Sequence, residues 1–447
     1  MIKRSAILLA GLLALPALAA AAVQPVDNAT LQKSATRACQ RAERVLLGFA
    51  GECVASSIQR RVLSGDVAEY SFDIRTGAGP YDVIGIHRVV RESAPFQPVK
   101  TDQAVLAAHG DIWGFDAAFV SNPAQNLPVF LAQNGVDVWG IDFRWTRVPA
   151  TETDFSSFRN WGVETDARDL YVALGVARAV RLYTGNGFDS IHLLGWSRGG
   201  IISYAYLNAE TQFPGGFTNV TGFIPVDIYL KTDVPELQKG ACDRAAAGRV
   251  ELGNGNFASQ NGVLVSTLGF LALTAPNDPS PVPLFPGFTN RQAALFVGEA
   301  TFALANPVPF YHFTGGTFDA NGLPSGLLYT DETSFFQFEL GASPFQPLLE
   351  IVESDVAACD NPNDGVAFDD HLGEIDVPVL YVGAGGGFGE FGVYTTTLLG
   401  STDVTTHIVD LTPDEARLFD YGHADLFLAD DAQTRVWQPI LSWIQAH

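Results

Sequence analysis

Ser197 stands in a sequence pattern that can turn a serine hydroxyl into a nucleophile. In the stretch Gly195-Trp196-Ser197-Arg198-Gly199, a glycine lies two residues before the serine and another lies two residues after it. This spacing permits a very tight turn, because a Cβ atom at either glycine would clash where the chain nearly touches itself. A helix that begins at such a turn directs free N–H groups at the serine, where they can stabilise negative charge on a substrate oxygen. The chemistry indicated is acyl transfer.

The segments on either side of this turn have the patterns of a buried strand and a buried helix. Ile191–Leu194 is mostly apolar, and Ile201–Tyr206 continues with apolar and small residues. We expect the turn to strain the backbone of Ser197 and to hold its hydroxyl above the end of a sheet. In this context the sequence resembles the α/β-hydrolase superfamily and its nucleophile elbow.

The resemblance implies an α/β fold with a mostly parallel central sheet flanked by helices. Apolar or alternating runs mark the expected strands. Two antiparallel strands would open the sheet, and the parallel strands would follow. The expected strands are 67–74, 82–90, 104–108, 136–142, 191–194, 222–228, 376–383 and 404–411.

The same resemblance assigns an oxyanion hole made of backbone N–H groups. His109-Gly110 follows the strand 104–108, and in the superfamily a His-Gly pair at this place begins the loop that supplies one donor. The donors would be the N–H groups of Asp111 and of Arg198, the residue after the serine. His109 itself is interpreted as a residue that shapes the loop.

The order of the triad residues in the superfamily points to His423 as the catalytic base. His423 lies in Tyr421-Gly422-His423-Ala424-Asp425, about ten residues after the last expected strand. The triad acid usually follows the penultimate strand, where this chain instead has the Gly-rich run 384–389. Asp227, at the end of the strand 222–228, is the preferred acid, because strand ends hold triad residues in position. Glu390 is the first alternative and Asp403 the second.

A long insertion is expected between the sixth and seventh strands of the fold, over residues 230–374. It is rich in phenylalanine, proline and glycine, as in Ser334-Phe335-Phe336-Gln337-Phe338. Lipases and related hydrolases carry a lid or cap at this place. An aromatic cap above a serine nucleophile implies an apolar pocket for an acyl or alcohol group, although many of these aromatic residues must form the core of the insertion itself.

Residues 136–180 resemble the acid-lipase family in layout. A Val-x-Val-Trp strand is followed by an aromatic segment and by a helix with Asp169-Leu170, but the Asn-Ser-Arg-Gly signature of that family is absent. Asp142 and Arg144 are expected to form a structural ion pair. A helix is expected over 158–180, with Glu164, Asp166, Arg168 and Asp169 on its wetter side.

The N-terminus has the features of a secretory signal peptide. Lys3 and Arg4 precede an apolar run, and small residues up to Ala22 offer cleavage sites. The predicted organisation is a signal peptide over 1–22, an α/β-hydrolase core over 23–229 and 375–447, and the insertion between the two parts of the core. Export to the periplasm or the medium permits disulfides, and the preferred pairs are Cys39–Cys53 and Cys242–Cys359.

Composition and charge exclude several classes of partner. The formal charge of −23 disfavours nucleic acids and anionic membranes, which need a basic surface. No clustered His/Cys spacing suggests a metal site, and the chemistry needs no cofactor. The longest apolar run of the insertion, 263–275, is too short to span a bilayer.

The function expected from these observations is hydrolysis of carboxylic esters with an apolar part, by a secreted serine hydrolase similar to lipases and esterases. Two alternatives remain open. One is hydrolysis of amide or peptide bonds on the same fold. The other is a catalytically silent binding protein, since fold alone does not imply function.

Overall fold

The computed structural model describes residues 55–216, 218–305, 311–359 and 365–447, and before them residues 29, 32, 33, 35–37 and 40. The predicted signal peptide lies outside the described residues, and so do Cys39 and Cys53, whose pairing stays a prediction. Within the described ranges, no helix combines the length and hydropathy needed to cross a membrane.

One twisted sheet of ten strands forms the centre of the molecule, in the order β1-β2-β3-β6-β5-β7-β8-β13-β14, with β4 paired to β3. Its first strands are antiparallel, and the run from β6 to β14 is parallel. The predicted fold class, a mostly parallel sheet opened by antiparallel strands, is confirmed. The strands are β1 (Gln59–Ser64), β2 (Val67–Arg75), β3 (Val83–Ala94), β4 (Gln97–Pro98), β5 (Gln103–Ala108), β6 (Val136–Asp142), β7 (Ile191–Trp196), β8 (Val220–Val226), β13 (Val379–Ala384) and β14 (Val404–Val409).

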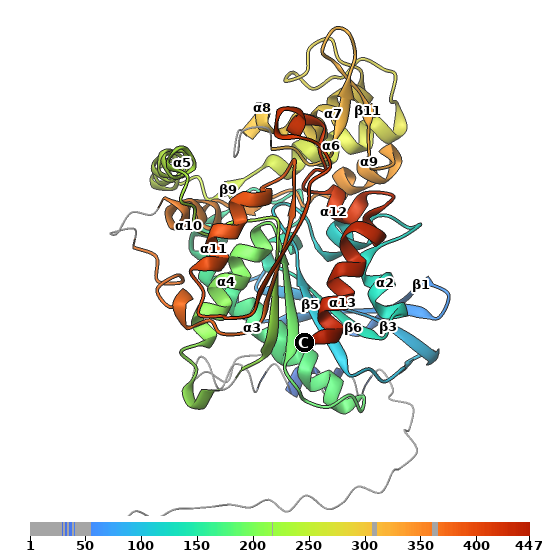
Figure 1. Cartoon of the computed structure of the whole chain (residues 1–447), viewed down its shortest axis with the longest axis vertical. Coiled ribbons are helices and arrows are strands. Elements are labelled where there is room, and N and C mark those ends of the chain that lie inside the picture. The colour runs from blue at the N-terminus through green and yellow to red at the C-terminus, as the bar shows by residue number, and fades with distance from the viewer. Residues whose placement is uncertain are drawn as a thin grey trace, which may run out of the picture.

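Helices cover both faces of the sheet, which explains why its central strands are mostly apolar and are buried along nearly their whole length. β6 and β7 are buried at every residue. α3 and α4 cover one face, while α2 and α13 cover the other (Figure 1). These helices, with the short helices near the C-terminus, are α2 (Leu127–Gln133), α3 (Val163–Tyr183), α4 (Arg198–Glu210), α11 (Val393–Thr397), α12 (Asp425–Leu428) and α13 (Gln438–Ala446).

The segment between β8 and β13 is largely helical, and much of it lies above one end of the sheet (Figure 1). Leu268, Ala294 and Phe338 of this insertion belong to the same hydrophobic cluster as Trp113 and Trp196 of the core. Its elements are α5 (Pro235–Gly253), β9 (Ala258–Ser259), α6 (Asn261–Thr274), α7 (Asn290–Glu299), α8 (Thr301–Ala305), β10 (Gly316–Phe318), β11 (Pro324–Leu327), α9 (Glu332–Leu340), β12 (Gln346–Pro347) and α10 (Leu348–Ala358).

A disulfide joins Cys242 in α5 to Cys359, the residue after α10, with a Cα–Cα distance of 4.7 Å. This pairing was predicted and is confirmed. The two helices also pack against each other through Ala245, Val352 and Val356. The disulfide therefore links the start and the end of the insertion.

The ion pair predicted between Asp142 and Arg144 is wrong. Asp142 ends β6 and pairs with His87 of the neighbouring strand β3 and with Arg147. Arg144 begins the short 3₁₀ helix after β6, and its guanidinium binds Asp169 and Asp82. The two side chains point away from each other toward different partners. Their spacing in the sequence does not show this difference in direction.

The helix expected over 158–180 begins later, at Val163, after a short 3₁₀ helix (Ser156–Asn160). Asp166 and Asp169 were expected on its wetter side, but both are fully buried. Asp169 can be buried because Arg144 forms two hydrogen bonds with it, at 2.7 and 2.5 Å. Glu164 and Arg168 are exposed as expected. The expectation failed for Asp169 because its partner, Arg144, lies in a different element.

Candidate active site

Ser197 occupies the tight turn between β7 and α4, with φ 55° and ψ −129°. This region is sparsely populated for residues other than glycine, so the turn is strained as expected. The flanking glycines permit it: a Cβ atom at Gly195 would lie 2.5 Å from the carbonyl oxygen of Gly199, and one at Gly199 would lie 2.3 Å from that of Ala108. The side chain thus stands at the carboxyl end of a central strand.

His423 and Asp227 form a buried hydrogen-bonded pair. The Nδ1 atom of His423 lies 2.6 Å from Oδ2 of Asp227, and both side chains are inaccessible to solvent. Because a carboxylate accepts, Nδ1 carries the proton, and in the neutral imidazole this tautomer leaves Nε2 with its lone pair. Nε2 has no hydrogen-bond partner in the part of the chain that the structure describes. A histidine in this state can accept a proton from a hydroxyl group.

The Gly-rich turn after β13 holds Asp227 in place. The N–H groups of Ala384 and Gly389 donate to Oδ1, each at 2.8 Å, and that of Phe388 donates to Oδ2 at 3.1 Å. A Cβ atom at Gly387 would lie only 2.1 Å from Oδ2, so glycine lets the turn approach this closely. This turn has no carboxylate of its own at the position where the superfamily usually places the triad acid. It instead helps to hold the carboxylate of Asp227, the residue after β8.

The two alternative acids lie elsewhere. The side chain of Glu390 is 70% exposed and lies 3.7 Å from Arg417. Asp403 is also exposed and lies 3.3 Å from His447, near the C-terminus. Of the three candidates, only Asp227 contacts His423 in the structure.

The loop after β5 passes directly beside the serine. A Cβ atom at Gly110 would lie 2.7 Å from Cβ of Ser197 and 3.2 Å from its Oγ. The N–H group of Asp111, the next residue, donates no hydrogen bond within the described part of the chain. Arg198 is the first residue of α4, where an amide has no acceptor within its own helix. Both predicted oxyanion donors thus lie in segments that flank the serine.

His109 shapes this loop as the sequence indicated. Its Nδ1 donates to the carbonyl oxygen of Gly110 at 2.9 Å, and its Nε2 accepts the N–H of Phe143 at 3.3 Å. Burial lowers the pKa of His109 to about 4, so the ring is neutral at pH 7. Both ring nitrogens are used in holding the backbone, and neither is left for proton transfer.

Aromatic rings surround His423. Trp196 stacks on the imidazole at a centroid distance of 4.9 Å, and Tyr311, Phe313 and Phe388 lie at 5.3 to 5.6 Å. Tyr311 and Phe313 come from the insertion. The phenylalanine content of the insertion indicated an apolar lining, but no sequence signal distinguished these two rings from those that form the insertion's own core.

Asp425 is a further residue of this site that the sequence analysis did not assign. It accepts the N–H groups of Gly422 and Gly315 at 2.7 and 2.8 Å and the hydroxyl of Thr330 at 2.6 Å. Burial raises the pKa of Asp425 to about 7, although these three donors act in the opposite direction. The available signal was its position two residues after His423. Asp425 ties the histidine loop to the insertion.

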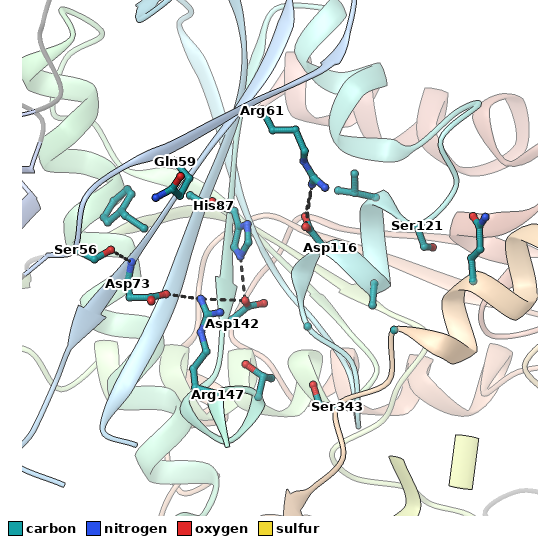
Figure 2. Close-up of a pocket in the computed structure, with 18 of the residues that line it drawn as sticks. Ser56, Gln59, Arg61, Asp73, His87, Asp116, Ser121, Asp142, Arg147 and Ser343 are labelled. Atoms are coloured by element: carbon teal, nitrogen blue, oxygen red, sulfur yellow. Dashed lines mark hydrogen bonds and ion pairs between the residues drawn. The ribbon is translucent and has the colours of Figure 1, made fainter. Parts of the chain in front are cut away.

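A polar cavity of about 880 Å³ lies beside β2 and β3, and neither Ser197 nor His423 lines it. His87 lies at this cavity and points to Asp142 (Figure 2), with Nε2 3.1 Å from the carboxylate. Its Nδ1 lies 2.7 Å from Glu69. Burial alone would lower the pKa of His87, but the carboxylates of Asp142 and Glu69 raise it to about 10.

The protonated ring of His87 has no lone pair for a metal ion. Glu69, His87 and Asp116 come close enough together to suggest a metal site. However, both ring nitrogens already donate to carboxylates, and Arg61 binds the other two residues. This cluster is an ion-pair network that joins β1, β2, β3 and β6. Asp142 of the network also accepts the N–H of Phe115 at 2.7 Å, which anchors the far end of the loop after β5.

No protein-family model matches the chain. A probable lipase of Schizosaccharomyces pombe is 25% identical over 134 residues, a match that spans 29% of this chain and 29% of the relative's length. A crystal structure described as a candidate lipase from Sulfolobus solfataricus superposes with a TM-score of 0.58 at 19% identity, over 87% of this chain and 98% of that one.

A monoglyceride lipase of Saccharomyces cerevisiae is more distant, with a TM-score of 0.42 at 13% identity, over 88% of this chain and 96% of that one. The superposition at 0.58, together with the strand order and the turn at Ser197, shows that this protein has the α/β-hydrolase fold.

Proposed function

We propose that this protein, with its α/β-hydrolase fold, is a secreted or periplasmic serine hydrolase that cleaves carboxylic esters. The observation that carries the proposal is the buried 2.6 Å hydrogen bond between Asp227 and His423, which leaves Nε2 of the imidazole unpartnered. Such a bond orients a histidine as a general base. Ser197, on its strained turn at the adjacent strand end, is the matching nucleophile.

In the proposed mechanism, Ser197 attacks the ester carbonyl while Nε2 of His423 takes the hydroxyl proton. The N–H groups of Asp111 and Arg198 stabilise the oxyanion, a contribution of about 3 kcal/mol per donor in enzymes of this kind. His423 then returns the proton to the leaving alcohol, and an acyl-enzyme remains. Water activated by His423 releases the acid.

The rings around His423 favour a substrate with an apolar acyl or alcohol part. The relative in Schizosaccharomyces pombe is named as a probable lipase, which favours esters over amides. The insertion covers this region, so we assign it the role of a cap. The N-terminal pattern of a signal peptide, together with the disulfide Cys242–Cys359, supports an oxidising location outside the cytoplasm.

Fluorophosphonate labelling of the mature protein, with mass spectrometry to locate the adduct, tests the proposal. We expect an adduct on Ser197 in the wild type and none in Ser197→Ala. The rates of hydrolysis of a p-nitrophenyl ester and of the anilide of the same acyl group would separate an esterase from an amidase. If the wild type shows neither an adduct nor turnover, the protein is a binding protein on a hydrolase fold.

A further inference from the structure

The side chains of the two proposed oxyanion donors are bound to each other. Nε and Nη2 of Arg198 donate to the two carboxylate oxygens of Asp111, at 2.8 and 3.1 Å. One residue follows the nucleophile, and the other lies on the loop after β5. In an oxyanion hole, the backbone N–H groups of these two residues would have to point at the same oxygen atom. A rigid link between the two side chains would restrict how far the two N–H groups can move relative to each other.

The backbone of the loop that carries Asp111 is irregular and strained. It is neither helix nor strand, and Ile112 has a positive φ of 55°, which is strained for a β-branched residue. Strained backbone persists only where the surroundings hold it. A bidentate guanidinium–carboxylate pair provides such a constraint because its two parallel hydrogen bonds fix orientation as well as distance.

The insertion forms hydrogen bonds with three consecutive residues of this loop. The amide of Gln346 in β12 donates to Oδ1 of Asp111, and the N–H of Ser343 donates to the carbonyl oxygen of Ile112 at 2.5 Å. The indole N–H of Trp113 donates to the carbonyl oxygen of Phe338 at 2.9 Å. Residues 338–346 are therefore attached to the same turn that would supply an oxyanion donor.

Glu350 completes the surroundings of the pair. Its Oε1 lies 4.0 Å from Nε of Arg198, and its Oε2 lies 3.4 Å from the amide nitrogen of Gln346. Burial raises the pKa of Glu350 to about 8, although Arg198 acts in the opposite direction. At pH 7 this side chain is therefore mostly neutral, and the charge of Arg198 is balanced chiefly by Asp111.

We propose that Gln346 of the insertion, acting through the Asp111–Arg198 ion pair, positions the two backbone N–H groups of the oxyanion hole. On this proposal, which rests on the proposed function, Gln346 and the side chains of Asp111 and Arg198 are positioning residues. The insertion then contributes to transition-state stabilisation in addition to covering the site. Misplacement of a catalytic group by about 1 Å can cost up to about 100-fold in rate.

Two variants test the link while keeping the buried charges balanced. Gln346→Leu removes the amide donor and keeps a side chain of similar volume. Arg198→Lys keeps the positive charge but cannot form the bidentate interaction with Asp111. Matched controls are Gln238→Leu, which removes a 2.7 Å amide hydrogen bond to Thr232 in the insertion, and Arg291→Lys, which alters a bidentate pair with Glu332. For each protein, kcat and KM are measured on a p-nitrophenyl ester, together with the rate constant of inactivation by a phosphonate whose P–O group takes the place of the oxyanion.

We expect kcat to fall about tenfold in Gln346→Leu and more in Arg198→Lys, with KM nearly unchanged and the inactivation rate falling in proportion. Both controls should stay within about twofold of the wild type. Wild-type kcat in both test variants, an effect on KM alone, or an equal loss in the controls would overturn the inference while leaving the proposed function intact. An inactive, unlabelled wild type would overturn both.

Discussion

Asp227 and His423 are 196 residues apart in the sequence, yet Nδ1 of the imidazole lies 2.6 Å from Oδ2 of the carboxylate. The contact forms because β8, β13 and β14 are parallel neighbours that end at the same edge of the sheet, and His423 lies in the segment after β14. Asp227 follows β8, and it accepts three N–H groups from the last residue of β13 and from the turn after that strand. The carboxylate is thus fixed on one side by backbone and is free on the other to orient the histidine.

Replacing Asp227 by asparagine should reduce kcat on an ester by about 10⁴-fold, because the amide favours the wrong imidazole tautomer. Glu390→Gln is the control and should retain wild-type kcat, since Glu390 is exposed and contacts Arg417. Steady-state kinetics and the rate of fluorophosphonate labelling check both variants. A loss of activity confined to Glu390→Gln would move the acid to the turn after β13.

His87 should stabilise the fold in a pH-dependent way. Its pKa of about 10 in the folded protein exceeds the ordinary value of 6.5, so the folded state binds the proton more tightly. The stabilisation is fully present below pH 6.5 and is lost as the pH rises through about 10. His87→Gln should lower the free energy of unfolding by about 3 kcal/mol at pH 6, because it breaks a buried ion pair.

Urea unfolding of the wild type and of His87→Gln at pH 6, 8 and 10 checks this prediction. The difference between the two proteins should shrink steadily over this range. Arg168→Gln, which removes an exposed pair with Glu164, serves as a control with little expected effect at any pH. A constant difference from pH 6 to pH 10 would show that His87 contributes through packing and not through its charge.

Glu350 should also make the protein less stable as the pH rises, because burial disfavours its ionised form. Its pKa is raised from the usual 4.5 to about 8, so the folded state prefers the protonated carboxyl group. Stability from this group is therefore full below pH 4.5 and falls as the pH rises to about 8. Glu350→Gln, which stays neutral, should be more stable than the wild type at pH 9, by an amount on the order of 5 kcal/mol at most.

Thermal unfolding followed at pH 5, 7 and 9 measures this effect, with the two proteins expected to converge at pH 5. Glu236→Gln, at an exposed glutamate in the first turn of α5, is a control that should show no such trend. Equal stabilities at pH 9 would mean that Glu350 ionises near its ordinary pKa and is well compensated by Arg198.

Loss of the disulfide should destabilise the protein substantially. Cys242 and Cys359 are separated by 117 residues, so the bond removes considerable entropy from the unfolded chain. Cys242→Ser with Cys359→Ser should lower the free energy of unfolding by roughly 3 to 5 kcal/mol. Guanidinium unfolding with and without reductant measures this, and the double variant should be less sensitive to the reductant than the wild type.

The sequence by itself determined the local chemistry of the turn. Gly195, Ser197 and Gly199 lie within five residues, and the strand and helix around them are contiguous, so their geometry follows from short-range sterics. Most of the strands could be predicted for a related reason: a strand covered on both faces must be apolar along its length. The linear order of the chain also placed His423 in the segment after the last strand.

Only the tertiary structure decided which carboxylate meets His423, since Asp227, Glu390 and Asp403 were all candidates and their sequence context does not report distance. The same holds for Asp169, which was expected near water but is buried against Arg144, and for Gln346, which reaches Asp111 across 235 residues. Local geometry depends on neighbouring residues, whereas these contacts depend on how the whole sheet pairs and how the insertion packs on it. The pairing of the sheet and the packing of the insertion depend on many interactions between residues far apart in the sequence, so no short segment of the sequence determines these contacts.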